Sequence, residues 1–139
     1  MTAAEKYLKF ILCVTWADGK VVEEEITLFE LLLNNSGVDP VIDEECRSYL
    51  QPDHPIDIDD TLRAVAEDME LPRLPQFIQD GYLMASSNSD LNPAQIEAMD
   101  KFMSLCGVES DNFEDIHQWA IDGLDHMTKG VELLAPKED

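Results

Sequence analysis

Two stretches of this chain carry the same pattern of apolar residues, and that repeat constrains the fold more than any other feature. Aligning Gly107-Val108-Glu109 on Gly37-Val38-Asp39 fixes an offset of 70 residues (107 − 37). At this offset apolar residues coincide without gaps, among them Leu8 with Ile78, Phe29 with Met99 and Tyr49 with Trp119. Self-similarity at one fixed offset is typical of a repeated supersecondary unit. The sequence therefore predicts two copies of one unit, at about residues 3–51 and 73–121.

Within each unit the apolar residues recur at the spacing of an amphipathic helix, and no segment shows the alternation typical of strands. Gly37 and Gly107 favour helix ends, and Asp39-Pro40 favours a helix start. We predict an all-α fold: a single domain over residues 1–139, formed as a bundle of about seven to eight helices from two pseudo-repeated three-helix units. The predicted helices cover residues 3–16, 23–35, 40–50, 59–70, 74–86, 93–105 and 111–121, with a partly helical tail over 122–134.

The charge of the chain limits its partners. Asp and Glu number 30 against 9 Lys and Arg, which gives a formal net charge of −21. Such a field repels phosphate backbones and anionic lipid headgroups, so we expect no nucleic-acid binding and no direct membrane binding. The same field attracts divalent cations and basic protein surfaces.

The apolar runs and the cysteines indicate an intracellular protein. The longest runs, such as residues 10–14, are too short to span a bilayer, and no signal-peptide pattern opens the chain. We therefore expect a cytoplasmic protein without membrane insertion. Cys13, Cys46 and Cys106 are odd in number and set among apolar residues, which predicts buried, reduced thiols.

The turn between the first two predicted helices carries the one motif that points to a chemistry. Residues 17–25 read Ala-Asp-Gly-Lys-Val-Val-Glu-Glu-Glu. Asp18, Gly19, Val21 and Glu25 match the recurring pattern of the tellurite-resistance TerB-like family, which is Ala-Asp-Gly, an apolar residue two positions on, and an acidic helix start. The chain resembles that family over most of its length, because the family is also all-helical with pseudo-repeated halves.

The resemblance implies a non-enzymatic protein that binds a divalent cation through acidic residues. It also implies protein partners, basic or associated with membrane complexes, in a tellurite, metal or envelope stress response. Together with the repeat, it makes Asp18, Glu25, Asn88 and Asp90 the candidate metal ligands. Clustered oxygen ligands suit hard cations, so calcium or magnesium is expected rather than zinc. The second copy departs from the motif, since residues 87–90 read Ser-Asn-Ser-Asp and offer weaker ligands.

The same residues also have a purely structural interpretation. Residues 92–95 (Asn-Pro-Ala-Gln) fit a capping box, in which Gln95 folds back onto the backbone of the cap. The repeat places Val22 at the equivalent cap and Glu25 at the third helical position, while Asp18 closes the turn. The alternative function is then a metal-free interaction module that docks basic partners through its acidic surface.

The known metal-binding and catalytic motifs that the sequence partly matches are incomplete. An EF-hand beginning at Ser86 places Leu91 where the loop needs glycine. Glu114 and His117 have the Glu-x-x-His spacing of di-iron bundles, but the second pair is missing because the repeat mate of His117 is Arg47. No phosphate-binding glycine loop, nucleophile elbow or zinc spacing is present in the sequence. We therefore predict that the chain is not an enzyme.

Overall fold

Helices account for all the regular structure in the part of the chain that the computed structural model describes, residues 1–86 and 92–134. These residues form seven α-helices and two 3₁₀ helices and contain no strand, which confirms the predicted all-α fold class. In chain order the elements are α1 (Ala3–Trp16), α2 (Glu23–Asn34), α3 (Pro40–Ser48), α4 (Ile58–Glu67), η1 (Leu71–Arg73), α5 (Leu74–Ala85), α6 (Pro93–Leu105), η2 (Ser110–Asn112) and α7 (Phe113–Leu134). Within the described ranges, no helix is both long and apolar enough to cross a membrane.

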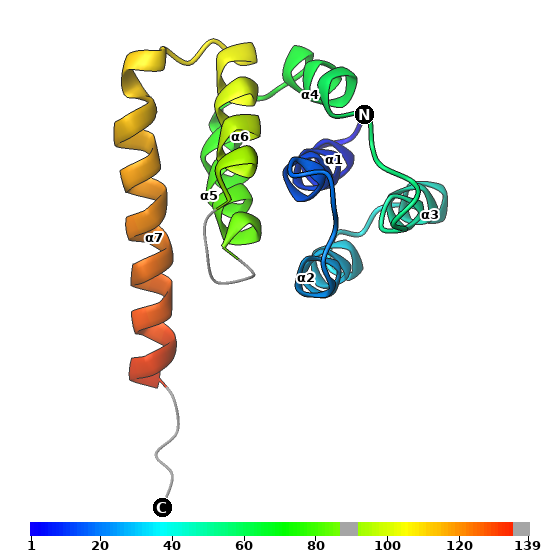
Figure 1. The fold of residues 1–139 in the computed structure, drawn as a ribbon, viewed down its shortest axis with the longest axis horizontal. Coiled ribbons are helices and arrows are strands. Elements are labelled where there is room, and N and C mark those ends of the chain that lie inside the picture. The colour runs from blue at the N-terminus through cyan, green and yellow to red at the C-terminus, as the bar shows by residue number, and fades with distance from the viewer. Residues whose placement is uncertain (87–91, 135–139) are drawn as a thin grey trace, which may run out of the picture.

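Helix α1 lies at the centre of the fold, where it contacts each of the helices from α2 to α6 (Figure 1). Its sequence explains this place, because every residue from Phe10 to Trp16 is buried. The polar member of that run is Thr15, whose hydroxyl donates a hydrogen bond to the backbone oxygen of Ile11 at 2.8 Å. A stretch of helix that is apolar on nearly all sides has to be covered by neighbouring elements.

A cluster of aromatic rings joins α1 to the second half of the chain. The ring of Phe10 lies 5.6 Å from that of Phe77 in α5 and 4.6 Å from that of Phe102 in α6, measured between centroids. All three rings belong to one continuous core of buried residues. Phe10 therefore holds α1, α5 and α6 together.

Local signals set the helix ends as the sequence predicts. Gly37 and Gly107, which follow α2 and α6, have φ angles of 72° and 88°, the left-handed conformation in which a side chain would be strained. The carboxylate of Asp39 accepts a hydrogen bond from the backbone N–H of Ile42 at 3.0 Å and so caps α3.

The predicted repeat agrees with the first two helices of each unit but not with the third. Helices α5 and α6 begin 71 and 70 residues after α1 and α2 (74 − 3 and 93 − 23). Helix α3 has 9 residues, whereas its counterpart opens with η2 and continues as the 22-residue α7. The predicted helix over 111–121 and the tail over 122–134 thus form one helix after a short 3₁₀ turn, because no proline interrupts them. The two-copy architecture stays a prediction.

Helix α7 runs alongside α5 and α6 and extends past their ends (Figure 1). The side-chain amide of Gln79 in α5 donates a hydrogen bond to the backbone oxygen of Ala120 in α7 at 3.1 Å. A Cβ on Gly123 would lie 2.7 Å from that same amide nitrogen. Glycine at this position therefore leaves room for the Gln79 side chain between α5 and α7.

Candidate functional site

The starts of α2 and α6 lie against each other, and we call this contact the turn junction, formed by Asp18, Val22, Glu25, Asn92 and Gln95. Asp18 Oδ1 accepts a hydrogen bond from the backbone N–H of residue 20 at 3.3 Å, which closes the turn as the structural interpretation predicts. Asp18 Oδ2 accepts a second one from Asn92 Nδ2 at 3.0 Å. The first turn is thus joined to the cap of the equivalent helix in the second half of the chain.

Glu25 lies at the bottom of the turn junction with only 2% of its surface exposed. Its Oε1 accepts a hydrogen bond from the backbone N–H of Val22 at 3.0 Å, which is the capping contact that the sequence predicts. Its Oε2 accepts a hydrogen bond from Gln95 Nε2 at 2.7 Å. Gln95 is the repeat mate of Glu25 (25 + 70) and is equally buried. The two equivalent residues therefore contact each other.

Gln95 departs from the predicted capping box. Asn92 caps α6, since its Oδ1 accepts a hydrogen bond from the backbone N–H of Ala94 at 2.9 Å. The amide of Gln95, however, is directed across the junction to Glu25 rather than toward its own cap. Its Nε2 donates to the buried carboxylate of Glu25, and a hydrogen bond to a charged group is stronger than one between neutral groups.

The surroundings of Glu25 raise its pKa above the ordinary value of 4.5. Burial is the main cause, because it disfavours the charged form, and the nearby Asp18 carboxylate adds to it. The hydrogen bonds from Val22 and Gln95 and the charge of Lys20 act in the opposite direction. The junction therefore holds two carboxylates whose hydrogen-bond donors are neutral amides.

The four predicted metal ligands divide into two pairs. Asp18 and Glu25 lie together in the turn junction, where both carboxylates have structural hydrogen-bond partners. Asn88 and Asp90 lie outside the described residues. Over residues 1–86 and 92–134, no group of three or more His, Cys, Asp and Glu side chains is arranged to hold a metal ion.

The histidine considered for catalysis and the cysteines contribute to packing and to contacts between helices. His117 Nε2 lies 2.6 Å from Asp100 Oδ1, which ties α7 to α6. Cys13 and Cys46 are buried free thiols as predicted, whereas Cys106 is only half-buried. Burial raises the pKa of Cys13 to about 12, so this thiol stays protonated.

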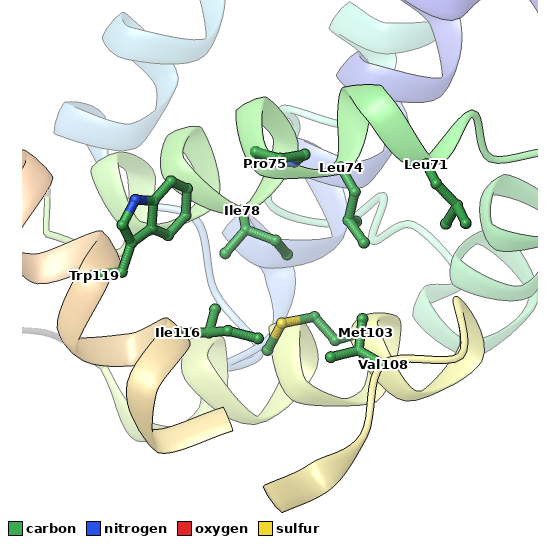
Figure 2. Close-up of a pocket in the computed structure, with 8 residues that line it drawn as sticks. All are labelled: Leu71, Leu74, Pro75, Ile78, Met103, Val108, Ile116 and Trp119. Atoms are coloured by element: carbon green, nitrogen blue, oxygen red, sulfur yellow. The ribbon is translucent and has the colours of Figure 1, made fainter. Parts of the chain in front are cut away.

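A second feature was not predicted from the sequence: an apolar groove between α5 and α7. It encloses about 330 Å³ and is lined by eight side chains from η1, α5, α6, the loop after α6, and α7 (Figure 2): Leu71, Leu74, Pro75, Ile78, Met103, Val108, Ile116 and Trp119. We call this the α5–α7 groove. Trp119 and Leu71, at its two ends, remain 48% and 60% exposed. Large apolar side chains left exposed along the rim of an apolar groove mark binding sites on many proteins.

One sequence signal could have indicated this groove. Residues 71–75 read Leu-Pro-Arg-Leu-Pro, a joint between units that nevertheless carries two leucines. Leucines at the very start of a helix lie beyond its main apolar face, so they cover a neighbouring element or remain exposed.

No protein-family model matches the chain, and neither does any curated protein or solved structure. The resemblance to the TerB-like family therefore depends on the motif at residues 17–25 and on the repeat.

Proposed function

We propose that this protein is a non-enzymatic binding protein that docks a basic protein partner through its acidic surface. The observation that carries the proposal is that most of the basic side chains form ion pairs with carboxylates of the same chain. At least six of the nine Lys and Arg residues form ion pairs within the fold: Lys6, Lys9, Arg47, Arg63, Arg73 and Lys101. Their charges are neutralised locally, so the excess of carboxylates acts on whatever approaches the surface.

The TerB-like resemblance supports a role in tellurite, metal or envelope stress, with partners in membrane-associated complexes. An acidic adaptor would suit that role, because the cytoplasmic surfaces of membrane complexes carry an excess of Lys and Arg. The chain would then reach the membrane through a protein partner, since its own charge opposes contact with anionic lipid.

Docking through charge should depend on salt and on particular carboxylates. In affinity capture from an extract of the source cell, basic proteins should be retained at low salt, released at high salt and unaffected by a chelator. The Asp115→Asn, Asp122→Asn variant should lose most of them, because these exposed carboxylates lie beside the α5–α7 groove on α7. The control is Glu23→Gln, Glu24→Gln, which removes two equally exposed charges from α2. Equal capture by both variants would place the docking surface away from the α5–α7 groove, and capture that persists at high salt would contradict the proposal.

A second candidate function is divalent-cation binding at the turn junction. The observation that favours it is the proximity of Asp18 to the buried carboxylate of Glu25, whose pKa is raised by burial first and by the Asp18 charge to a smaller extent. Two neighbouring carboxylates with neutral amide donors would gain from a bound cation, and oxygen ligands favour calcium or magnesium.

Calorimetric titration of chelator-treated protein with calcium, magnesium, manganese and zinc tests this second candidate. Saturable binding is expected for the wild type and for the Glu23→Gln, Glu24→Gln control. Binding should be lost in Asp18→Asn, Glu25→Gln, which removes the same number of charges but keeps the shape of both side chains. No saturable heat, or equal heat in the two variants, would rule out this site.

A further inference from the structure

The α5–α7 groove has a closed floor. Ile78 and Met103 are only 2% and 1% exposed and form this floor, while Trp119 and Leu71 stand at opposite ends (Figure 2). On either side of this floor, Figure 2 shows Ile116 and Val108 facing Leu74 and Pro75. The groove therefore presents two apolar walls to any chain that lies along it.

The chemistry of the lining favours a protein segment over a small molecule. Small-molecule sites combine apolar walls with a few polar groups that fix the orientation of the ligand. In the α5–α7 groove the single polar side-chain atom is the indole nitrogen of Trp119. What fits such a lining is a row of apolar side chains, and an amphipathic helix presents them at positions i, i+3 or i+4, and i+7.

The negative charge beside the groove favours a helix that carries basic residues. Residues 102–128, which supply one wall, contain no Lys or Arg. They contain six carboxylates: Glu109, Asp111, Glu114, Asp115, Asp122 and Asp125. Asp115 and Asp122 lie one helical turn before and after Trp119, so they flank it on the same face of α7, and both are exposed. Lysines or arginines beside the apolar anchors of a partner would meet these carboxylates.

The same charge opposes the most obvious alternative, a second copy of this chain. Two molecules that each carry −21 repel each other, and juxtaposed like charges suppress association. An aromatic residue at one end of a groove is also a typical anchor point, because Trp is enriched among the residues that dominate binding energy.

We propose that the α5–α7 groove binds an amphipathic helix of a partner protein, with apolar anchors seated between Trp119 and Leu71 and Lys or Arg residues facing Asp115 and Asp122. This inference rests on the proposed function, which it deepens by naming the surface and the form of the partner.

The test uses two synthetic peptides of about 18 residues, roughly five helical turns, with the same composition of leucine and lysine. In the first, the leucines form one helical stripe. In the second, they are spread around the helix. The readout is Trp119 fluorescence, taken as the difference between the wild type and Trp119→Phe, because Trp16 is buried and bonded to the backbone of Tyr49. The stripe peptide should shift the Trp119 emission to the blue. It should also bind at least about tenfold more tightly than the peptide whose leucines are spread around the helix.

A matched pair of variants locates the site. Leu71→Ser removes an exposed leucine at one end of the groove, and Val41→Ser removes a 74% exposed valine from α3, outside it. Neither residue is buried, so both variants should keep the wild-type melting temperature. Leu71→Ser should weaken binding of the stripe peptide about tenfold, and Val41→Ser should leave it unchanged.

Each outcome bears on the proposal. Equal affinity for the two peptides without a change at Trp119 would overturn the helix site but leave charge-driven docking intact. Failure of both peptides to bind at low salt would overturn both proposals. Sedimentation that shows dimers, lost in Leu71→Ser, would show that a second copy covers the groove and would overturn the inference.

Discussion

Replacing Phe10 by alanine should lower the free energy of unfolding by about 3–5 kcal/mol, as large-to-small changes of buried aromatic residues do. The ring is fully buried in α1, and it contacts the rings of Phe77 and Phe102 from two other helices. Its loss would leave a cavity where α1, α5 and α6 meet. The surrounding helices cannot collapse into this cavity, because α1 is held by contacts with five neighbours.

Urea unfolding followed by circular dichroism measures this effect. The control is Leu31→Ala, which shortens an exposed side chain on α2 and should change the stability by no more than about 0.5 kcal/mol. A loss below about 1 kcal/mol for Phe10→Ala would show that the aromatic cluster is not what holds the two halves of the chain together.

Replacing Glu25 by alanine should cost about 1–3 kcal/mol, because it leaves the buried amide of Gln95 without its hydrogen-bond partner. The change also removes the acceptor for the backbone N–H of Val22 at the start of α2. Glu25→Gln should cost far less at neutral pH. Its amide oxygen can still accept from Val22, and Gln95 can rotate its amide to match.

The pH dependence separates the charge of Glu25 from its hydrogen bonds. Burial raises the pKa of Glu25 in the folded protein above its ordinary value of 4.5, so the folded state binds this proton more tightly than the unfolded state does. The stability gained from protonation is fully present below 4.5 and is lost as the pH rises through the raised pKa. The wild type should therefore lose more stability than Glu25→Gln as the pH rises from about 4 to 7.

Denaturant unfolding of the three proteins at several pH values measures both effects. A penalty for Glu25→Gln equal to that for Glu25→Ala would mean that the charge itself stabilises the junction. A wild-type pH dependence no steeper than that of Glu25→Gln would contradict the raised pKa.

Much of the helical structure could be predicted because its signals are local. The predicted starts of the helices at Ala3, Glu23, Pro40 and Pro93 are those of α1, α2, α3 and α6. Apolar spacing at the period of a helix, a capping residue and a proline at the first position act within a single turn of the chain. They require no knowledge of what the helix packs against.

The contacts between elements could not be predicted in the same way. The repeat equates Trp119 with Tyr49, yet Tyr49 is half-buried and stacks on His54 at 5.0 Å, whereas Trp119 is 48% exposed beside a groove. The difference arises because, among the described residues, no further helix covers the side of α7 on which Trp119 lies. Likewise, the alignment pairs Glu25 with Gln95, but only the packing of α2 and α6 brings these side chains within 2.7 Å of each other.

If the α5–α7 groove is the surface that binds a partner, a nitrogen–proton chemical-shift titration with the leucine-stripe peptide should locate the contact there. We expect the largest changes at the indole N–H of Trp119 and at the backbone amides of residues 71–78, 103–108 and 116–119, with α3 unchanged. Changes centred on residues 18–25 and 92–95, or spread evenly over the acidic surface, would contradict it.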